Sequence, residues 1–194
     1  IADYLPVHDR SSRAFIDVSA HPSSFRTLRG PVSLLSSRWT DLALLDRLMA
    51  SPLPIKAVPP LGSVGVLALR LAAQLFEGPI FIVGLDFAYP QGQTHCTGSP
   101  ADLHERNHET RLYKRSTRWE LGFREGSQRR ENLISDPALS MYAGLAAREL
   151  RQFQASPGGI AYDLRQGMGA PLPARPTTFS EARTIMMLAS GSRM

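Results

Sequence analysis

The residues best suited to chemistry lie where an apolar run gives way to a polar loop. Asp86 follows the apolar run Ile80–Leu85, and His95 comes nine residues later in the glycine-containing loop Tyr89–Gly98. A neutral imidazole can accept a proton near pH 7, and a nearby carboxylate can orient it or bind a sugar hydroxyl. We therefore take Asp86 and His95 as the candidate catalytic residues.

Other interpretations of these loop residues stay open. Asp86 could accept backbone N–H bonds at a strand end or hold a metal through water, and His95 could donate a hydrogen bond to a leaving phosphate or simply face solvent. Tyr89 could donate its hydroxyl to a phosphate, or it could be a packing residue. Thr94, next to His95, and Gly84, before Asp86, complete this group of candidate binding residues.

A second candidate site lies at Gly62-Ser63-Val64, immediately before a long apolar segment. Free backbone N–H groups and the helix dipole favour an anion at the start of a helix, where Gly62 permits close approach and Ser63 adds a hydroxyl donor. Alternatively, Ser63 caps its own helix. The stretch is neither a P-loop nor a dinucleotide fingerprint, because no Lys-Ser/Thr follows and the Gly-x-Gly-x-x-Gly spacing is absent.

The remaining polar side chains indicate solvated surfaces. His104 and His108 have i, i+4 spacing but lack the Glu of a His-Glu-x-x-His site, so we predict no metal site. Cys96 has no evident activating partner except His95. The arginines between positions 106 and 130 are interleaved with acids, so they favour a solvated helix face over a nucleic-acid interface.

Strand and helix patterns alternate along the chain, which predicts an α/β fold with a mostly parallel sheet flanked by helices. In such sheets, ligands bind at the carboxyl ends of the strands. The expected strands are 14–19, 31–36, 55–58, 80–85 and 160–164. The expected helices are 40–49, 64–76, 106–119, 137–153 and a short one from Ser180.

Composition limits the class of protein. The chain has 194 residues, 43% hydrophobic, with a net charge of +5 that comes mostly from arginine, a residue suited to anionic partners. No apolar stretch reaches the length of a bilayer crossing, so we expect no membrane association. One cysteine and no leader pattern favour the cytoplasm. The start at Ile1 suggests a piece of a longer chain.

The segment Gly62–Gly98 resembles the MptE-like domain family, which includes the motility-associated factors (Maf proteins) of flagellin glycosylation. The family pattern has three parts, all present here. The matching residues are Gly62-Ser63-Val64; then Gly84, Asp86, Ala88 and Tyr89; then Gly92, Thr94, His95 and Gly98. Phe15–Pro22 is more loosely similar to a family strand that ends in Asp-Pro, here His21-Pro22, and Tyr162–Gly167 to the closing Asn-x-Thr-Glu-Gly-Gly segment.

The resemblance implies a Rossmann-like fold, similar to that of bacterial sialyltransferases, with its N-terminal part missing. It implies a transferase that moves a nonulosonic acid from a CMP donor to a hydroxyl of flagellin or another protein, without a metal. In that case Gly62, Ser63 and Val64 face the nucleotide phosphate, Tyr89 and His95 lie near the leaving group, and Asp86 supports the loop.

Two alternatives accompany this expectation. Archaeal members of the family transfer diphosphate from ATP to 6-hydroxymethyl-dihydropterin with magnesium, and a non-catalytic domain that binds a nucleotide or a protein is a third interpretation. We expect an MptE-like domain over residues 1–175 and a C-terminal helix, or the start of a following region, over 176–194. Neither a nucleic acid nor a membrane is an expected partner.

Overall fold

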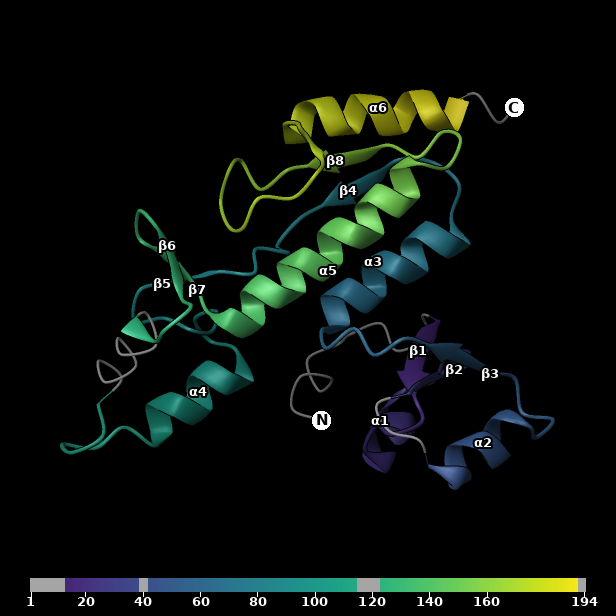
Figure 1. Cartoon of the computed structure of the whole chain (residues 1–194), viewed down its shortest axis with the longest axis horizontal. Helices are drawn as coiled ribbons and strands as arrows, with labels where there is room; N and C mark the ends of the chain where they lie inside the picture. Colours follow the sequence, from purple (N-terminus) through teal and green to yellow (C-terminus); the bar gives the residue numbers. More distant parts are fainter. Residues whose placement is uncertain (1–12, 39–41, 115–122, 192–194) are drawn as a thin grey trace. The chain divides into compact units, whose positions relative to one another are not determined.

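The computed structural model describes residues 13–38, 42–114 and 123–191. The chain divides into two compact units, which we call the N-terminal unit (Ile1–Leu61 with Gly98–Ala101) and the C-terminal unit (Gly62–Thr97 and Asp102–Met194). Each unit contains one three-stranded parallel sheet, so the expected α/β class with parallel sheets and flanking helices is confirmed (Figure 1). The predicted domain limits, 1–175 and 176–194, stay a prediction.

The N-terminal unit is built on the parallel sheet β1-β2-β3, in which each strand pairs with the next one along the chain. Ile16, Leu35 and Val58 form its buried centre. The elements are β1 (Ala14–Asp17), α1 (Pro22–Thr27), β2 (Val32–Ser37), α2 (Ala43–Met49) and β3 (Ile55–Val58). The predicted helix start at Thr40-Asp41 lies outside the described residues.

The C-terminal unit is built on the parallel sheet β4-β8-β9 and two packed helices. In Figure 1 the strands β4 and β8 run between α6 on one side and α3 with α5 on the other. Its elements on this sheet are α3 (Val64–Leu75), β4 (Ile80–Ile82), α5 (Pro137–Gln154), β8 (Ala161–Asp163), β9 (Arg175–Pro176) and α6 (Phe179–Gly191). Helix α5 begins as its sequence predicts, because Asp136 accepts a hydrogen bond from the amide of Leu139 and Pro137 occupies the first turn.

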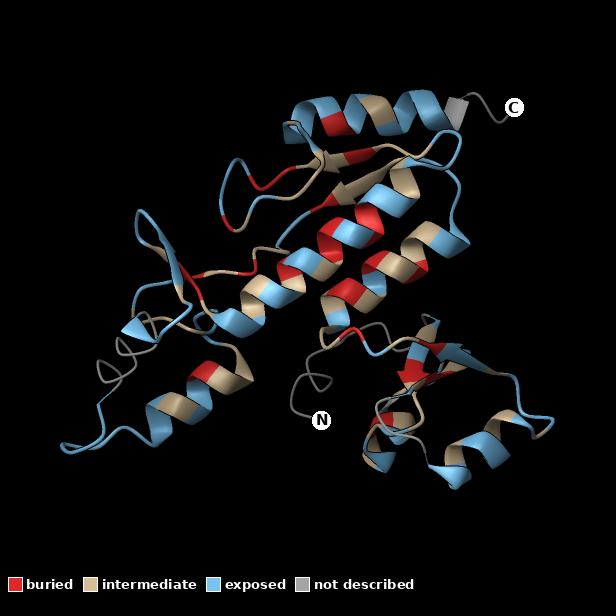
Figure 2. Cartoon of the chain, in the orientation of Figure 1, coloured by how far each residue is buried: buried red, intermediate tan, exposed pale blue. Residues whose placement is uncertain are grey.

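The core of this unit lies between α3 and α5, where red buried stretches of the two helices face each other in Figure 2. Val66, Ala146 and Leu150 are completely buried there. The two helices are also joined by an ion pair, in which one Arg70 nitrogen lies 3.0 and 3.1 Å from the two Glu149 oxygens. This packing fixes where α3 begins relative to the sheet.

An antiparallel sheet, β5-β7-β6, interrupts the parallel pattern and was not predicted. Its strands are β5 (Tyr89–Pro90), β6 (Gln128–Arg130) and β7 (Leu133–Ser135). A tight turn at Glu131 joins β6 to β7, and β5 pairs with the other edge of β7. Charged residues dominate the β6 segment, so it carries no apolar alternation that would indicate a strand.

The helix expected over residues 106–119 is wrong in position. Helix α4 spans Pro100–Asn107, and Ser99-Pro100 provides the pattern of a capping residue with proline in the first turn. Residues 115–119 of the expected helix lie outside the described ranges.

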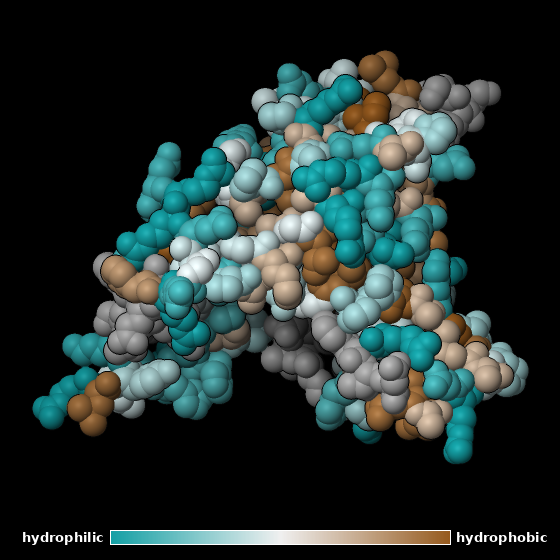
Figure 3. Space-filling view, in the orientation of Figure 1, coloured by the Kyte–Doolittle hydropathy of each residue, from teal (hydrophilic) through white to brown (hydrophobic). Residues whose placement is uncertain are grey.

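Helix α6 carries exposed apolar side chains at Met186, Met187 and Leu188, and Figure 3 shows apolar atoms over this helix. No helix within the described ranges has both the length and the apolar character of a bilayer crossing.

Candidate functional site at the carboxyl edge of the β4-β8 sheet

The start of helix α3 has unpaired donors. Ser63 precedes the helix in an extended conformation, and its hydroxyl makes no capping hydrogen bond and no other contact with a described residue. The amides of Val64, Gly65 and Val66 also have no acceptor within the described part, because the first bond of the helix joins the Leu67 amide to the Ser63 carbonyl. These donors are free to bind an anion.

Glycines bring this helix start close to its neighbours. Gly62 has a φ of +71°, and a side chain there would collide with the ring of Tyr142 on α5. A side chain at Gly65 would collide with Leu85, which follows β4. The sequence suggested that Gly62 admits a ligand, but in the structure its close neighbour is the Tyr142 ring. The tight packing at Gly65 places the α3 start beside the end of β4.

Asp86 follows β4 through a turn at Gly84, whose φ is +66°. Its carboxylate, half-buried, has no hydrogen-bond or ion-pair partner within the described residues. Asp86 therefore lacks the structural role of an aspartate that accepts backbone N–H bonds. Its backbone is fixed, because the Ala170 amide donates to the Asp86 carbonyl over 2.7 Å and a side chain at Gly169 would collide with the Asp86 backbone.

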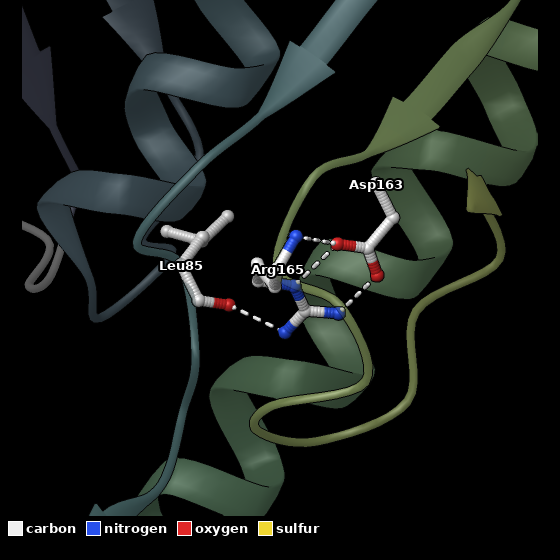
Figure 4. A network of polar contacts seen from close by, with 3 residues as sticks. All are labelled: Leu85, Asp163 and Arg165. Atoms are coloured by element: carbon white, nitrogen blue, oxygen red, sulfur yellow. Dashed lines mark hydrogen bonds and ion pairs between the residues drawn. The ribbon is translucent and has the colours of Figure 1, made fainter. Parts of the chain in front are cut away.

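The end of β8 carries a closed ion pair, shown in Figure 4. Arg165 donates two hydrogen bonds to the carboxylate of Asp163, from Nε over 2.9 Å and from Nη2 over 2.8 Å. Its Nη1 donates to the backbone carbonyl of Leu85 over 2.9 Å. Because Arg165 is buried and each of its three side-chain nitrogens donates to a protein acceptor, it ties the β8 loop to the β4 loop.

Burial opposes ionisation of Asp163, but the hydrogen bonds and charge of Arg165 outweigh it and lower the pKa of this carboxyl below its ordinary value. The ionised Asp163 therefore belongs to the folded state. Thus the α3 start, the β4 loop and the β8 loop meet at the carboxyl edge of the sheet, which is the edge where α/β proteins bind ligands.

His95 belongs to a different set of contacts. Its Nδ1 lies 2.9 Å from a carboxylate oxygen of Glu105 on α4 and 3.1 Å from the hydroxyl of Thr94. One interpretation of the sequence was that Asp86 orients this imidazole. In the structure, the carboxylate beside the imidazole is that of Glu105. No described contact joins His95 to Ser63 or Asp86.

Tyr89 is buried on β5, and its hydroxyl has no partner within the described residues. Burial and the nearby Asp136 carboxylate raise the pKa of this phenol, partly opposed by Arg124. The hydroxyl therefore stays protonated and remains a donor. Its predicted contact with a phosphate stays a prediction.

The N-terminal unit has a third strand-end aspartate. Asp17 of β1 accepts hydrogen bonds from the Ser37 amide over 2.7 Å and from the Ser19 amide and hydroxyl. Burial opposes ionisation, but these bonds hold its pKa below the ordinary value. His21, at the position of the family's Asp-Pro, caps α1 by accepting from the Ser23 amide.

Two hollows among the described residues do not coincide with the predicted site. A hollow of about 610 Å³ lies at the last turns of α3 and α5, near Phe76 and Gly159, which precede β4 and β8. That is the amino edge of the sheet, where an open α/β fold does not usually bind its ligand. A smaller hollow of about 30 Å³ lies between Ala88 and Gly169. Neither hollow is lined by Ser63 or His95.

The sequence analysis missed two side chains that contact the candidate region, Arg165, which joins the two loops, and Glu105, which lies beside His95. Asp-x-Arg at a strand end could have suggested a local ion pair, whereas nothing in the sequence distinguishes Glu105 from the other acids of its segment. Val64 was a predicted binding residue, and it is 85% exposed. Within the described ranges, no three metal-ligating side chains are grouped together.

Comparison with known proteins gives one informative match. An uncharacterised protein of Treponema pallidum (strain Nichols) is 32% identical over 140 residues. The match covers 69% of this chain but only 24% of the relative's length. No family model and no solved structure matches the chain.

Proposed function

We propose that the carboxyl edge of the β4-β8 sheet binds the phosphate of a nucleotide-activated substrate and that the protein is a transferase. The observation that carries this proposal is the start of α3, where the Ser63 hydroxyl and the amides of Val64, Gly65 and Val66 have no partner among the described residues. A phosphate accepts several such hydrogen bonds at once and is favoured by the helix dipole. Leu85, the residue before Asp86, packs against Gly65 of the same helix, and the Asp86 carboxylate, which has no partner among the described residues, can accept from a sugar hydroxyl.

Within this class we propose a glycosyltransferase that takes a nonulosonic acid from its CMP donor. The support is the sequence resemblance over Gly62–Gly98. In the reaction, the oxygen of a protein hydroxyl, such as one on flagellin, bonds to the anomeric carbon and loses its proton to His95. The bond from that carbon to the phosphate oxygen breaks, and CMP leaves with the electron pair. We place the reaction in the cytoplasm, which suits the exposed, unpaired Cys96.

The second candidate is a 6-hydroxymethyl-dihydropterin diphosphokinase. The observation in its favour is the Asp86 carboxylate, which has no partner among the described residues and follows the Leu85 that packs against α3, because Mg²⁺ usually binds to one or two carboxylates together with substrate phosphates. In that case Asp86 would hold the ion and Ser63 would still face a phosphate. The diphosphokinase reaction needs ATP and stops when Mg²⁺ is chelated, whereas the glycosyl transfer needs a CMP-linked donor and no metal.

The test is calorimetric titration of the chain with CMP, and with ATP in the presence and absence of Mg²⁺. We expect CMP to bind with one-to-one stoichiometry and the Ser63→Ala, Asp86→Asn double variant to bind it at least tenfold more weakly. Ser180→Ala, at the start of the exposed helix α6, is the matched control and should bind as the wild type does.

CMP binding that is unchanged in the double variant would contradict the proposed site. Binding of ATP only with Mg²⁺, lost in Asp86→Asn, would favour the diphosphokinase. Binding of neither nucleotide at millimolar concentration would contradict both transferase proposals.

A further inference from the structure

The pair formed by His95 and Glu105 has the geometry of a catalytic dyad. Glu105 Oε1 lies 2.9 Å from His95 Nδ1, well within the distance of an ion pair. The Glu105 side chain is 12% exposed, whereas that of His95 is 44% exposed. A mostly buried carboxylate therefore lies beside one nitrogen of a ring that is itself partly exposed.

The position of this carboxylate decides which ring nitrogen carries the proton. An ionised carboxylate only accepts, so Nδ1 must be the donor at this distance. Thr94 then contacts the same Nδ1–H as a second acceptor, at 3.1 Å. Because a neutral imidazole carries one proton, Nε2 keeps its lone pair. We assign the tautomer from this hydrogen-bond network.

The opposite nitrogen, Nε2, is unoccupied. His95 makes no contact other than those with Thr94 and Glu105 in the part of the chain that the structure describes. Glu105 itself has at least one interaction besides its contact with His95. An anchored nitrogen opposite a free one is the arrangement of a general base oriented by a carboxylate.

We propose that Glu105 is the positioning residue for His95, and that it sets the Nδ1–H tautomer so that Nε2 takes the proton of the acceptor hydroxyl. This inference rests on the proposed transferase function. In the transfer step, Nε2 binds that proton while the acceptor oxygen bonds to the anomeric carbon and CMP leaves. Glu105 touches neither substrate and stabilises the imidazolium that forms.

The other acids of this segment do not share this role. Asp102 is almost completely buried and lies 4.0 Å from the Arg106 guanidinium. Glu109 is exposed after the last turn of α4 and has no side-chain contact among the described residues. Glu109→Gln is therefore the matched control, because it removes a charge from the same segment without touching His95.

The first arm of the test needs no substrate. The ring nitrogens of the chain are labelled with ¹⁵N histidine, and the His95 signals are identified by their loss in His95→Ala. We expect the wild type and Glu109→Gln to show a protonated Nδ1 and an unprotonated Nε2. Glu105→Ala should show a mixture of both tautomers.

The second arm measures CMP release from CMP-N-acetylneuraminate, with water or a serine peptide as acceptor. We expect His95→Ala to lower kcat about 100-fold or more, as for loss of a general base. Glu105→Gln should lower kcat about tenfold with KM for the donor unchanged, because the amide oxygen still accepts from Nδ1 but carries no charge. Glu109→Gln should match the wild type.

The outcomes separate the two claims. Two results would overturn the positioning role while leaving the transferase intact. One is a wild-type kcat in both Glu105→Gln and Glu105→Ala, and the other is a His95 ring that carries its proton on Nε2 in the wild type. No CMP release by the wild type, with the Nδ1–H tautomer dependent on Glu105, would overturn the transferase and with it the catalytic use of the dyad.

Discussion

Strands β4 and β8 are neighbours in one parallel sheet, and an aspartate follows or ends each of them, but the two carboxylates have opposite surroundings. Asp163 at the end of β8 is held by Arg165, which also donates to the Leu85 carbonyl (Figure 4). Asp86 beyond β4 has no partner within the described residues. The paired aspartate holds the two loops together, whereas the unpaired one is available to a ligand.

The same contrast separates two helix starts. At α5, Asp136 accepts from the Leu139 amide and completes the first turn. At α3, the Ser63 hydroxyl makes no such bond. Polar groups that hydrogen-bond to one another therefore stabilise the fold. Polar groups without a described partner at the carboxyl edge of the β4-β8 sheet define the candidate site.

The largest effect should come from Arg165→Met. This change leaves the Asp163 carboxylate without its partner in a mostly buried position and the Leu85 carbonyl without its donor. We expect a loss of about 3 to 5 kcal/mol in the free energy of unfolding, measured with urea. Arg183→Met on the exposed face of α6 is the control and should change this value by less than about 0.5 kcal/mol. An equally small loss in Arg165→Met would show that the ion pair does not hold the loops.

A smaller loss should follow Gly169→Ala. Gly169 has a φ of +87°, and its new side chain would collide with the Asp86 backbone, which cannot move aside as a flexible side chain could. We expect a loss of about 2 to 3 kcal/mol on urea unfolding. Gly167→Ala separates the two causes, because its φ is +81° but a side chain there would meet open space. It should lose only about 1 kcal/mol. Equal losses in the two variants would contradict the close contact between the β8 loop and Asp86.

Acid should weaken the paired aspartate selectively. The pKa of Asp163 is lower in the folded state than its ordinary value of 3.8, so its contribution to stability is complete above that pH. The contribution is lost as the pH falls from 3.8 through the lower folded-state pKa. We expect the wild type to be more stable than Asp163→Asn at pH 6, and the difference to shrink below pH 3.8. Urea unfolding at a series of pH values measures this difference, and a constant difference down to pH 2 would contradict the assignment.

The smallest effect on stability should come from Ser63→Ala. Because the hydroxyl does not cap α3, its removal should change the free energy of unfolding by less than about 0.5 kcal/mol. Asp136→Ala is the matched comparison and should lose about 1 kcal/mol, since it removes a real capping bond. If Ser63→Ala loses as much as Asp136→Ala, Ser63 is a structural cap and the site loses its hydroxyl donor.

Much of the fold followed from local patterns. The apolar run from Val64 and the Asp136-Pro137 pair predicted α3 and α5 within a few residues, because apolar periodicity and capping act over short distances. The antiparallel sheet was missed because its pairing joins Tyr89 to Ile134, far apart in the chain and without an alternating pattern.

The candidate site was predictable in kind but not in its contacts. The glycine and serine before α3 indicated a helix start beside a strand end, which the structure bears out. The partner of His95 was not predictable, because Glu105 reaches it only through the fold of the intervening loop and the placement of α4. The ion pair of Asp163 was likewise not predictable in full. Arg165, which holds this carboxylate, also donates to the carbonyl of Leu85 beyond β4, a contact between distant parts of the chain.

The central claim is that the unpaired groups at the α3 start bind a nucleotide phosphate. The most direct measurement is the amide ¹H–¹⁵N NMR spectrum of the chain during titration with CMP. We predict that the largest shifts occur at Val64, Gly65 and Val66 and saturate together, while the amides at the start of α5 change little. Shifts centred on the amino edge of the sheet, near Gly159, or none at millimolar CMP, would contradict the claim.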